Sequence, residues 1–111
     1  RRASHWMSRN RFDVELLREA LKDLKDLKQY EDDAITEILK LEDDPYLGHT
    51  LSGSLRGTRS LEFNLPGYGE CRAVYIVDKR GHVCVMFIVG PHENIYQKAD
   101  RRAKAAFKHV K

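Results

Sequence analysis

Three β-strand patterns follow one another in the second half of the chain, and this run most limits the folds open to it. The segment 59–65 alternates apolar and polar side chains, and 82–89 is nearly all apolar, as expected of a central strand. The segment 71–78 is expected to be a strand with residues 72, 74, 76 and 78 on one face and 71, 73, 75 and 77 on the other. Turn residues at 66–69 and 79–81 separate the three segments. The pattern therefore predicts three consecutive antiparallel strands.

Helical patterns flank these strands. Residues 17–29 place leucines at helical spacing, and a second helix is expected from about residue 32 to the Asp44-Pro45 pair, because a residue before proline avoids the helical region. A short alternating stretch at 11–16 precedes them as a strand, and 94–110 follows as a helix. The order βααβββα predicts an α+β fold: an antiparallel sheet packed against an N-terminal helical hairpin and a C-terminal helix.

The chain of 111 residues is long enough for one domain, which we place at residues 11–111. Residues 1–10 show no periodicity and are expected to be a flexible N-terminal tail, either native or left over from expression. No apolar run approaches the roughly 20 residues that span a bilayer, and no signal-peptide pattern precedes the first helix. Cys71 and Cys84 fall on predicted strands and are interpreted as buried thiols rather than a disulfide. These features predict a soluble, cytoplasmic protein.

The overall charge of +3 is unevenly distributed. Counting side chains, residues 12–58 carry about −6, residues 97–111 about +5 and residues 1–11 about +4. A basic end beside an acidic helical half fits a protein that presents one face to a polyanion. The alternative is that the basic side chains of the last helix only solvate its outer surface and favour its dipole.

Polar side chains able to cut RNA without a metal lie at the predicted strand ends. Such cleavage needs a base for the 2′-hydroxyl, an acid for the leaving 5′-oxygen, cations for the phosphate and a group that holds the bases. Histidine titrates near neutral pH and suits the first two roles, and the planar fork of arginine suits the phosphate. The candidates are His49, Arg56, Arg59, Arg72, His92 and Tyr96.

Each candidate also has a structural interpretation. His92 at a strand end is compatible with an ordinary surface residue, and Tyr96 falls on the apolar stripe of the last helix. Arg72 lies among apolar neighbours and needs an anionic partner, which Glu62 on the neighbouring strand would supply as readily as a phosphate. Spacing alone does not show that the candidates converge.

In this order and at these intervals, the residues resemble the RelE/ParE superfamily of toxins from type II bacterial toxin-antitoxin systems. The resemblance runs from Phe12 to about Arg102. It is carried by the opening strand with its Leu-Lys-Asp-Leu helix, Asp44-Pro45, residues 51–57, residues 72–75, and residues 89–92 followed by Tyr96.

The resemblance to the ribonuclease branch implies a toxin that enters the ribosome and cleaves mRNA without metal or cofactor, and that a cognate antitoxin neutralises. It implies that Arg72 holds the scissile phosphate, that His92 is the general acid, and that His49 is the base or orients it. Tyr96 stands at or near a tyrosine of related members. Further contacts to rRNA or mRNA phosphates are expected from Arg56 and Arg59, and to rRNA or the antitoxin from the basic face of the last helix, including Lys98 and Arg101.

The chain departs from the branch at one point. Members that rely on paired lysines would have them near Ser60 and Glu62, and neither residue is basic here, which argues for a histidine-based arrangement. Two alternatives on the same fold stay open: a toxin directed at DNA gyrase, which needs no nuclease residues, and a catalytically inactive relic that only binds antitoxin.

Overall fold

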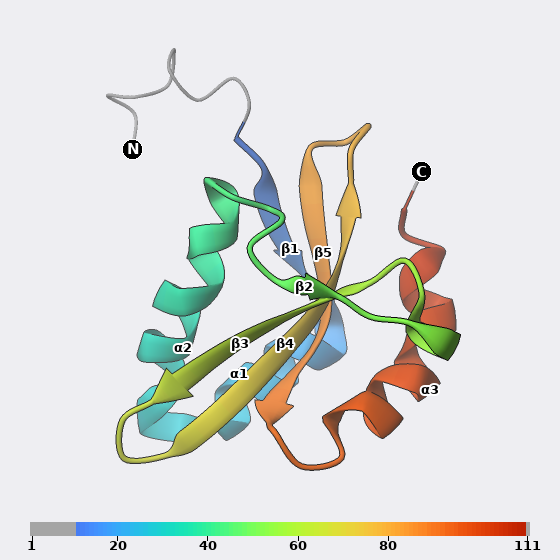
Figure 1. Ribbon diagram of the computed structural model, residues 1–111. Coiled ribbons are helices and arrows are strands. Elements are labelled where there is room, and N and C mark those ends of the chain that lie inside the picture. Colours follow the sequence, from blue (N-terminus) through green and yellow to red (C-terminus); the bar gives the residue numbers. More distant parts are fainter. Residues whose placement is uncertain (1–10, 111) are drawn as a thin grey trace.

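The computed structural model describes residues 11–110, and the tail predicted at residues 1–10 lies outside the described residues (Figure 1). One five-stranded sheet runs through it in the order β1-β5-β4-β3-β2. The strands are β1 (Asp13–Leu16), β2 (His49–Thr50), β3 (Arg59–Leu65), β4 (Gly69–Asp78) and β5 (Val83–Pro91). The helices are α1 (Arg18–Asp26), α2 (Glu31–Ile38) and α3 (Ile95–Phe107), with single 3-10 turns η2 (Lys28–Tyr30), η3 (Leu39–Glu42) and η4 (Gly53–Leu55).

The predicted α+β class is confirmed, with one difference in strand direction. Strands β3, β4 and β5 pair antiparallel as expected, but β1 lies beside β5 and runs parallel to it, so the sheet is mixed. Alternation of side chains fixes which face a residue points to and carries no information about the direction of the neighbouring strand. The two-residue strand β2, predicted as loop, is too short to show any alternation.

Each predicted N-terminal helix ends earlier than its apolar pattern and continues as a 3-10 turn. After α1 ends at Asp26, Lys28 adopts a positive φ of 54°, which breaks the helix before the apolar spacing does. After α2 ends at Ile38, η3 carries the chain to Glu42. The Asp44-Pro45 stop therefore lies just beyond the second helical segment, as predicted.

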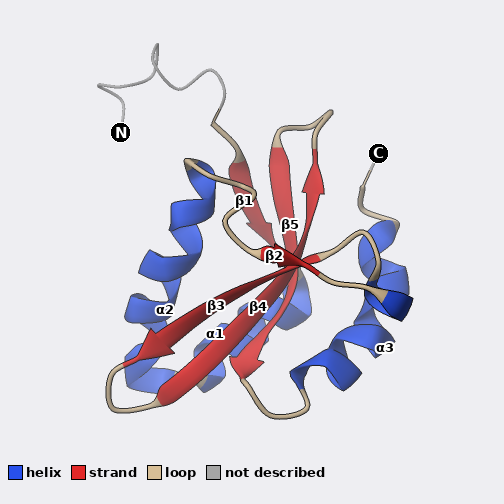
Figure 2. Ribbon diagram, viewed as in Figure 1, coloured by secondary structure: helices blue, strands red, loops and turns tan. Residues whose placement is uncertain are grey.

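The core has two layers, one on each face of the sheet (Figure 2). Alternation along β4 divides it as predicted, with Ala73 and Tyr75 facing α1 and α2 and with Val74 and Ile76 facing α3. Cys71 and Cys84 are buried free thiols on the α1–α2 face, as expected. Burial raises the pKa of Cys84 to about 12.

The two layers differ in extent. On the α1–α2 face, Leu61, Phe63 and Leu65 of β3 are all buried. On the other face, α3 packs mainly along β5, and Glu62 and Asn64 of β3 are exposed. The β3–β4 half of the α3 face is therefore open to solvent, and the candidate site lies there.

Within residues 11–110, no helix combines the length and the apolar character needed to cross a membrane.

Candidate functional site

Strand register brings four of the polar side chains to the open half of the α3 face. His49 of β2 lies opposite Ser60 of β3, and Glu62 of β3 lies opposite Arg72 of β4. Alternate residues of a strand and directly paired residues share a face, so these four side chains are neighbours. On its other side Arg72 pairs with Gly90 of β5.

Arg72 is held by an aromatic and an acidic partner. Its Nη1 donates to the Tyr96 hydroxyl at 2.5 Å and lies 3.4 Å from the Glu62 carboxylate, and its guanidinium carbon lies 5.3 Å from the centre of the Tyr96 ring. The Tyr96 hydroxyl in turn donates to the buried Ser60 at 3.2 Å. Among the described residues nothing accepts from Arg72 Nε, which is buried. A buried donor without a partner costs about 1–3 kcal/mol, so Arg72 is a cation still short of an acceptor.

The loop that precedes His49 is held by hydrogen bonds to Tyr75 of β4, on the α1–α2 face of the sheet. The Gly48 N–H donates to the Tyr75 hydroxyl at 3.0 Å, and that hydroxyl donates to the Pro45 carbonyl at 2.8 Å. A side chain at position 48 would bring Cβ to 2.7 Å from the Ser60 carbonyl oxygen, so only glycine fits there. Burial raises the pKa of Tyr75, which therefore stays a neutral hydrogen-bonding group. The result is that His49 reaches to 3.5 Å of the Glu62 carboxylate while staying half exposed.

Arg59 lies apart from this cluster and does not join Arg72. Its Nε donates to the Gly48 carbonyl at 2.8 Å and its Nη2 to the Tyr46 carbonyl at 3.1 Å. Its guanidinium also lies over the Tyr46 ring, 5.2 Å from the centre. The alternation of β3 turns Arg59 to the face opposite Ser60, so its observed contacts brace the loop before His49.

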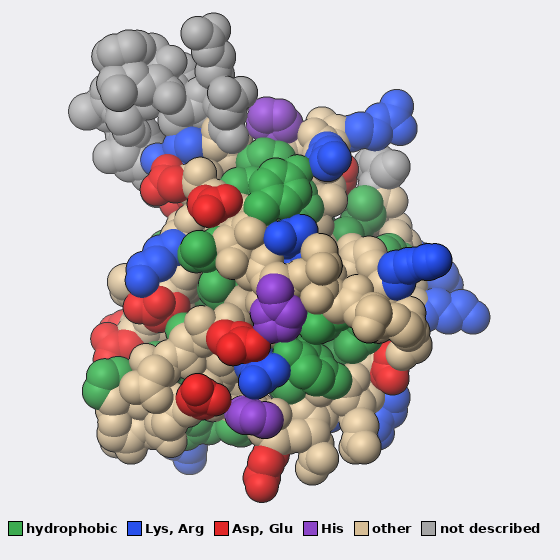
Figure 3. Space-filling model, in the orientation of Figure 1, with side chains coloured by type: hydrophobic (Ala, Val, Ile, Leu, Met, Phe, Trp, Pro, Cys, Tyr) green, Lys and Arg blue, Asp and Glu red, His purple; other side chains and the backbone are tan. Residues whose placement is uncertain are grey.

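His92 comes from the end of β5 and lies on the opposite side of Arg72 from His49 along the strands. It follows the last residue of the strand, two positions beyond the glycine that pairs with Arg72, and its backbone N–H donates to the Glu70 carbonyl at 3.2 Å. Its side chain is exposed. The space-filling view shows histidine, basic and acidic side chains close together on this face, over β3 and β4 (Figure 3).

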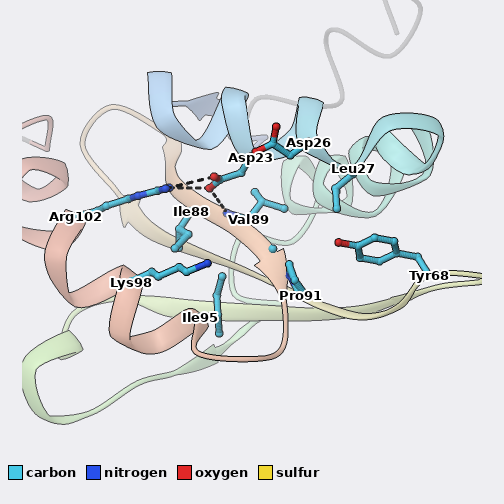
Figure 4. Close-up of a pocket in the computed structure, with 11 residues that line it drawn as sticks. Asp23, Asp26, Leu27, Tyr68, Ile88, Val89, Pro91, Ile95, Lys98 and Arg102 are labelled. Carbon is cyan, nitrogen blue, oxygen red and sulfur yellow. Dashed lines mark hydrogen bonds and ion pairs between the residues drawn. The ribbon is translucent and has the colours of Figure 1, made fainter.

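The other predicted basic residues lie elsewhere. Arg56 is exposed just after η4, and Arg101 lines a recess of about 380 Å³ between α1 and the second half of α3. Lys98 lines a separate cleft of about 130 Å³ along β5 (Figure 4). The structure therefore brings together His49, Arg72 and Tyr96 and places His92 just after the end of β5, two residues beyond the partner of Arg72. The remaining candidates lie outside this cluster.

The cleft beside Lys98 is built around a capped strand edge. Strand β1 pairs only with residues 83–86, so the outer edge of β5 beyond them has no partner strand. There the Val89 N–H donates to Asp23 Oδ2 at 3.0 Å (Figure 4). Arg102 donates to the Phe87 carbonyl at 3.0 Å. Asp23 and Arg102 also pair at 2.7 Å. Arg102 thus has a structural use, and part of the positive charge of α3 is neutralised.

Sequence reasoning missed two members of the cluster. Ser60 is a polar position of the alternating segment 59–65, but it is buried and accepts a hydrogen bond from the Tyr96 hydroxyl of α3. Glu62 was considered only as a partner for Arg72, and its contact with His49 depends on β2, which the sequence does not reveal. Within residues 11–110, no group of three or more His, Cys, Asp or Glu side chains is arranged to hold a metal ion.

Solved structures with the same fold are toxins of toxin-antitoxin systems. The RelBE2 toxin-antitoxin complex from Mycobacterium tuberculosis matches with a TM-score of 0.63 and 25% identity, over 74% of this chain and 99% of that chain. A mutant of the E. coli RelE toxin in the free state matches with a TM-score of 0.65 and 19% identity, over 83% and 97%. The intact E. coli RelBE complex matches with a TM-score of 0.58 and 18% identity, over 74% and 98%.

No curated protein sequence matches the chain. A family match covers most of it: residues 13–100 match the ParE-like toxins of type II bacterial toxin-antitoxin systems. This confirms the resemblance drawn from the strand and loop motifs, and the neighbouring structures agree with it in fold. The chain belongs to the ParE-like toxin family of type II bacterial toxin-antitoxin systems.

Proposed function

We propose that this toxin inhibits translation as a ribosome-dependent mRNA endoribonuclease that needs no metal. The observation that carries the proposal is the convergence of His49, Glu62, Arg72 and Tyr96 on the open β3–β4 half of the α3 face, with His92 just after the end of β5. The buried Nε–H of Arg72 has no acceptor among the described residues and is available to a bound anion such as a phosphate. The histidines and the cation are the groups that metal-free phosphodiester cleavage requires.

In the proposed reaction His49 accepts the proton of the 2′-hydroxyl. The resulting alkoxide attacks the adjacent phosphorus, the bond from phosphorus to the 5′-oxygen breaks, and His92 donates a proton to that oxygen. The products are a 2′,3′-cyclic phosphate and a 5′-hydroxyl. Arg72 stabilises the charge that develops on the phosphoryl oxygens, because a fixed donor in a partly dry site needs no reorganisation during the reaction.

The remaining residues position these groups. Tyr96 fixes the guanidinium of Arg72 through a 2.5 Å hydrogen bond, and Arg59 holds the loop before His49. Arg56, Lys98 and Arg101 lie outside the cluster, and we assign to them contacts with phosphates of the ribosome or mRNA, since such contacts position a protein without reading sequence.

The partner we propose is a cognate antitoxin. The similar structures from M. tuberculosis and E. coli are toxin-antitoxin complexes, which supports a protein partner that neutralises this chain. The location proposed for the toxin is the cytoplasm, where its ribosome target lies.

The proposal is tested by primer extension on an mRNA translated in a reconstituted system. Wild type is expected to cut within codons only when ribosomes are present, and His92→Ala to lose about 10²–10⁴-fold in rate. His109→Ala is the matched control, because it removes an exposed histidine from the far end of the chain. Intact mRNA with wild type, or normal cutting by His92→Ala, would overturn the nuclease proposal or the acid assignment respectively.

A toxin directed at DNA gyrase is the second candidate, favoured by the match to the ParE-like family. It predicts inhibition of DNA supercoiling by wild type, and equal inhibition by His92→Ala. A supercoiling assay with the same protein preparations distinguishes the two candidates.

A further inference from the structure

Glu62 occupies the centre of the cluster. A single carboxylate oxygen, Oε2, lies 3.5 Å from Nδ1 of His49 and 3.4 Å from Nη1 of Arg72. Strand register fixes this arrangement, because Glu62 lies directly opposite Arg72 and two residues along β3 from the partner of His49. The contact with His49 therefore follows from the pairing of β2 with β3.

The atom of His49 that faces the carboxylate decides what the other ring nitrogen can do. A neutral imidazole has one N–H and one acceptor nitrogen, and an ionised carboxylate only accepts hydrogen bonds. If Nδ1 carries the hydrogen toward Glu62, Nε2 keeps its lone pair and is free to accept a proton. Hydrogen bonds of this kind are often long without substrate and tighten when it binds, so 3.5 Å is compatible with the arrangement.

The same position has a cost for the proposed reaction. A carboxylate beside Arg72 competes with the substrate phosphate for the guanidinium and repels its charge. To benefit the reaction, an acidic residue at this position needs a role besides pairing with Arg72. Orienting His49 is the use that the 3.5 Å contact offers.

We propose that Glu62 is a positioning residue that holds His49 in the tautomer with hydrogen on Nδ1, so that Nε2 faces the substrate as the base. The assignment of His49 as base rests on the proposed function, whereas the tautomer itself does not. In this chain a carboxylate–histidine pair, formed by Glu62 and His49, thereby replaces the lysine-based arrangement.

The first test reads the tautomer without any cleavage. The full chain, labelled with ¹⁵N-histidine, is observed by NMR, and the His49 signals are assigned by their loss in His49→Gln. In wild type the hydrogen is expected on Nδ1, and Glu62→Gln is expected to keep it there, because the amide oxygen still accepts. Glu62→Ala is expected to move it to Nε2, whereas Glu70→Ala, which removes an exposed acid from β4, leaves it on Nδ1. A hydrogen on Nε2 in wild type, or a tautomer unaffected by Glu62→Ala, would overturn the proposal.

The second test uses single-turnover cleavage on the ribosome. Glu62→Ala is expected to lower the cleavage rate about 10–100-fold with little change in the concentration dependence, and Glu62→Gln to restore most of it. If Glu62 only neutralised Arg72, both variants would bind the substrate more tightly and cut at least as fast, which would refute the positioning role. Should wild type fail to cut, the nuclease proposal falls while the tautomer measurement still decides the role of Glu62.

Discussion

On one face of the sheet, α1 packs along β5 and α2 packs against β3 over a layer of aliphatic and aromatic side chains, whereas on the other α3 packs mainly along β5 and leaves Glu62 exposed beside Arg72. The buried residues of α3 are mostly alanines, so this helix lies close to the sheet and adds a thin layer. The first face secures the fold, and the second has room for polar chemistry. Substitutions on the two faces should therefore act on different properties.

The largest effect on folding is expected from Leu24→Ala on the α1–α2 face. Leu24 is fully buried, and removing its side chain should lower the free energy of unfolding by about 2–5 kcal/mol through lost burial and a residual cavity. Leu21→Ala is the matched control, because Leu21 lies on the same helix but is 46% exposed; it should stay within about 0.5 kcal/mol of wild type. If urea titrations showed equal losses in the free energy of unfolding for Leu24→Ala and Leu21→Ala, the α1–α2 face would not be the more densely packed face.

On the open face, Arg72→Ala should separate activity from stability. Removing one donor to a developing negative charge typically costs about 10²–10³-fold in rate, so mRNA cleavage on the ribosome should fall by that factor. The free energy of unfolding should change by about 1 kcal/mol or less, because the substitution also removes the buried Nε–H that has no acceptor, and the carboxylate of Glu62 stays solvent-accessible. Arg80→Ala, in the exposed turn after β4, should leave both quantities near wild type. A large loss of stability without loss of cleavage would reverse the assignment of the two faces.

Tyr75→Phe links the two faces, because a core tyrosine holds the loop of His49. Loss of its hydroxyl leaves the Gly48 N–H and the Pro45 carbonyl without their partner, which should lower the free energy of unfolding by about 1–3 kcal/mol. Tyr68→Phe removes a hydroxyl from an exposed ring and should change it by less than about 0.5 kcal/mol. A Tyr75→Phe chain as stable as wild type would mean that the loop is held by Arg59 alone.

The last comparison concerns the pH dependence of stability. Burial raises the pKa of Cys84 to about 12, from an ordinary value of 9.0. Between these pH values the unfolded chain releases the thiol proton and the folded chain keeps it, so the stability that this thiol contributes below pH 9 is lost as pH rises. The slope should reach about 1.4 kcal/mol per pH unit from this group. Cys84→Ala, although less stable at neutral pH, should show a shallower fall in alkaline urea titrations. Identical slopes would contradict the burial effect.

The elements of the fold could be predicted from the sequence because periodicity reports which face a residue occupies. The alternation in β3 and the apolar run of β5 identified both strands and their buried sides. The parallel placement of β1 and the two-residue β2 could not be predicted, since strand direction and very short pairings leave no periodic trace.

The candidate site was predictable in its residue types and not in its geometry. Arg72 stood out as a charged residue among apolar neighbours, and its pairing with Tyr96 joins positions 24 residues apart. Arg59 carries the same chemistry, but the alternation of β3 turns it to the other face, where it binds backbone carbonyls. Distinguishing these two arginines required the register of the strands and the path of the loop.

Asp23 of α1 and Arg102 of α3 both bind backbone groups at the outer edge of β5. If either helix detached from the sheet, the Val89 N–H or the Phe87 carbonyl would lose its partner. An edge with unpaired N–H and C=O groups is a template for pairing with a second chain. The pair joins residues 79 positions apart and makes α1 and α3 part of one cooperative unit. Fraying of the C-terminal helix would therefore expose a strand edge that can pair with another chain and aggregate. The rate of hydrogen exchange at the Val89 amide would report how often that edge opens.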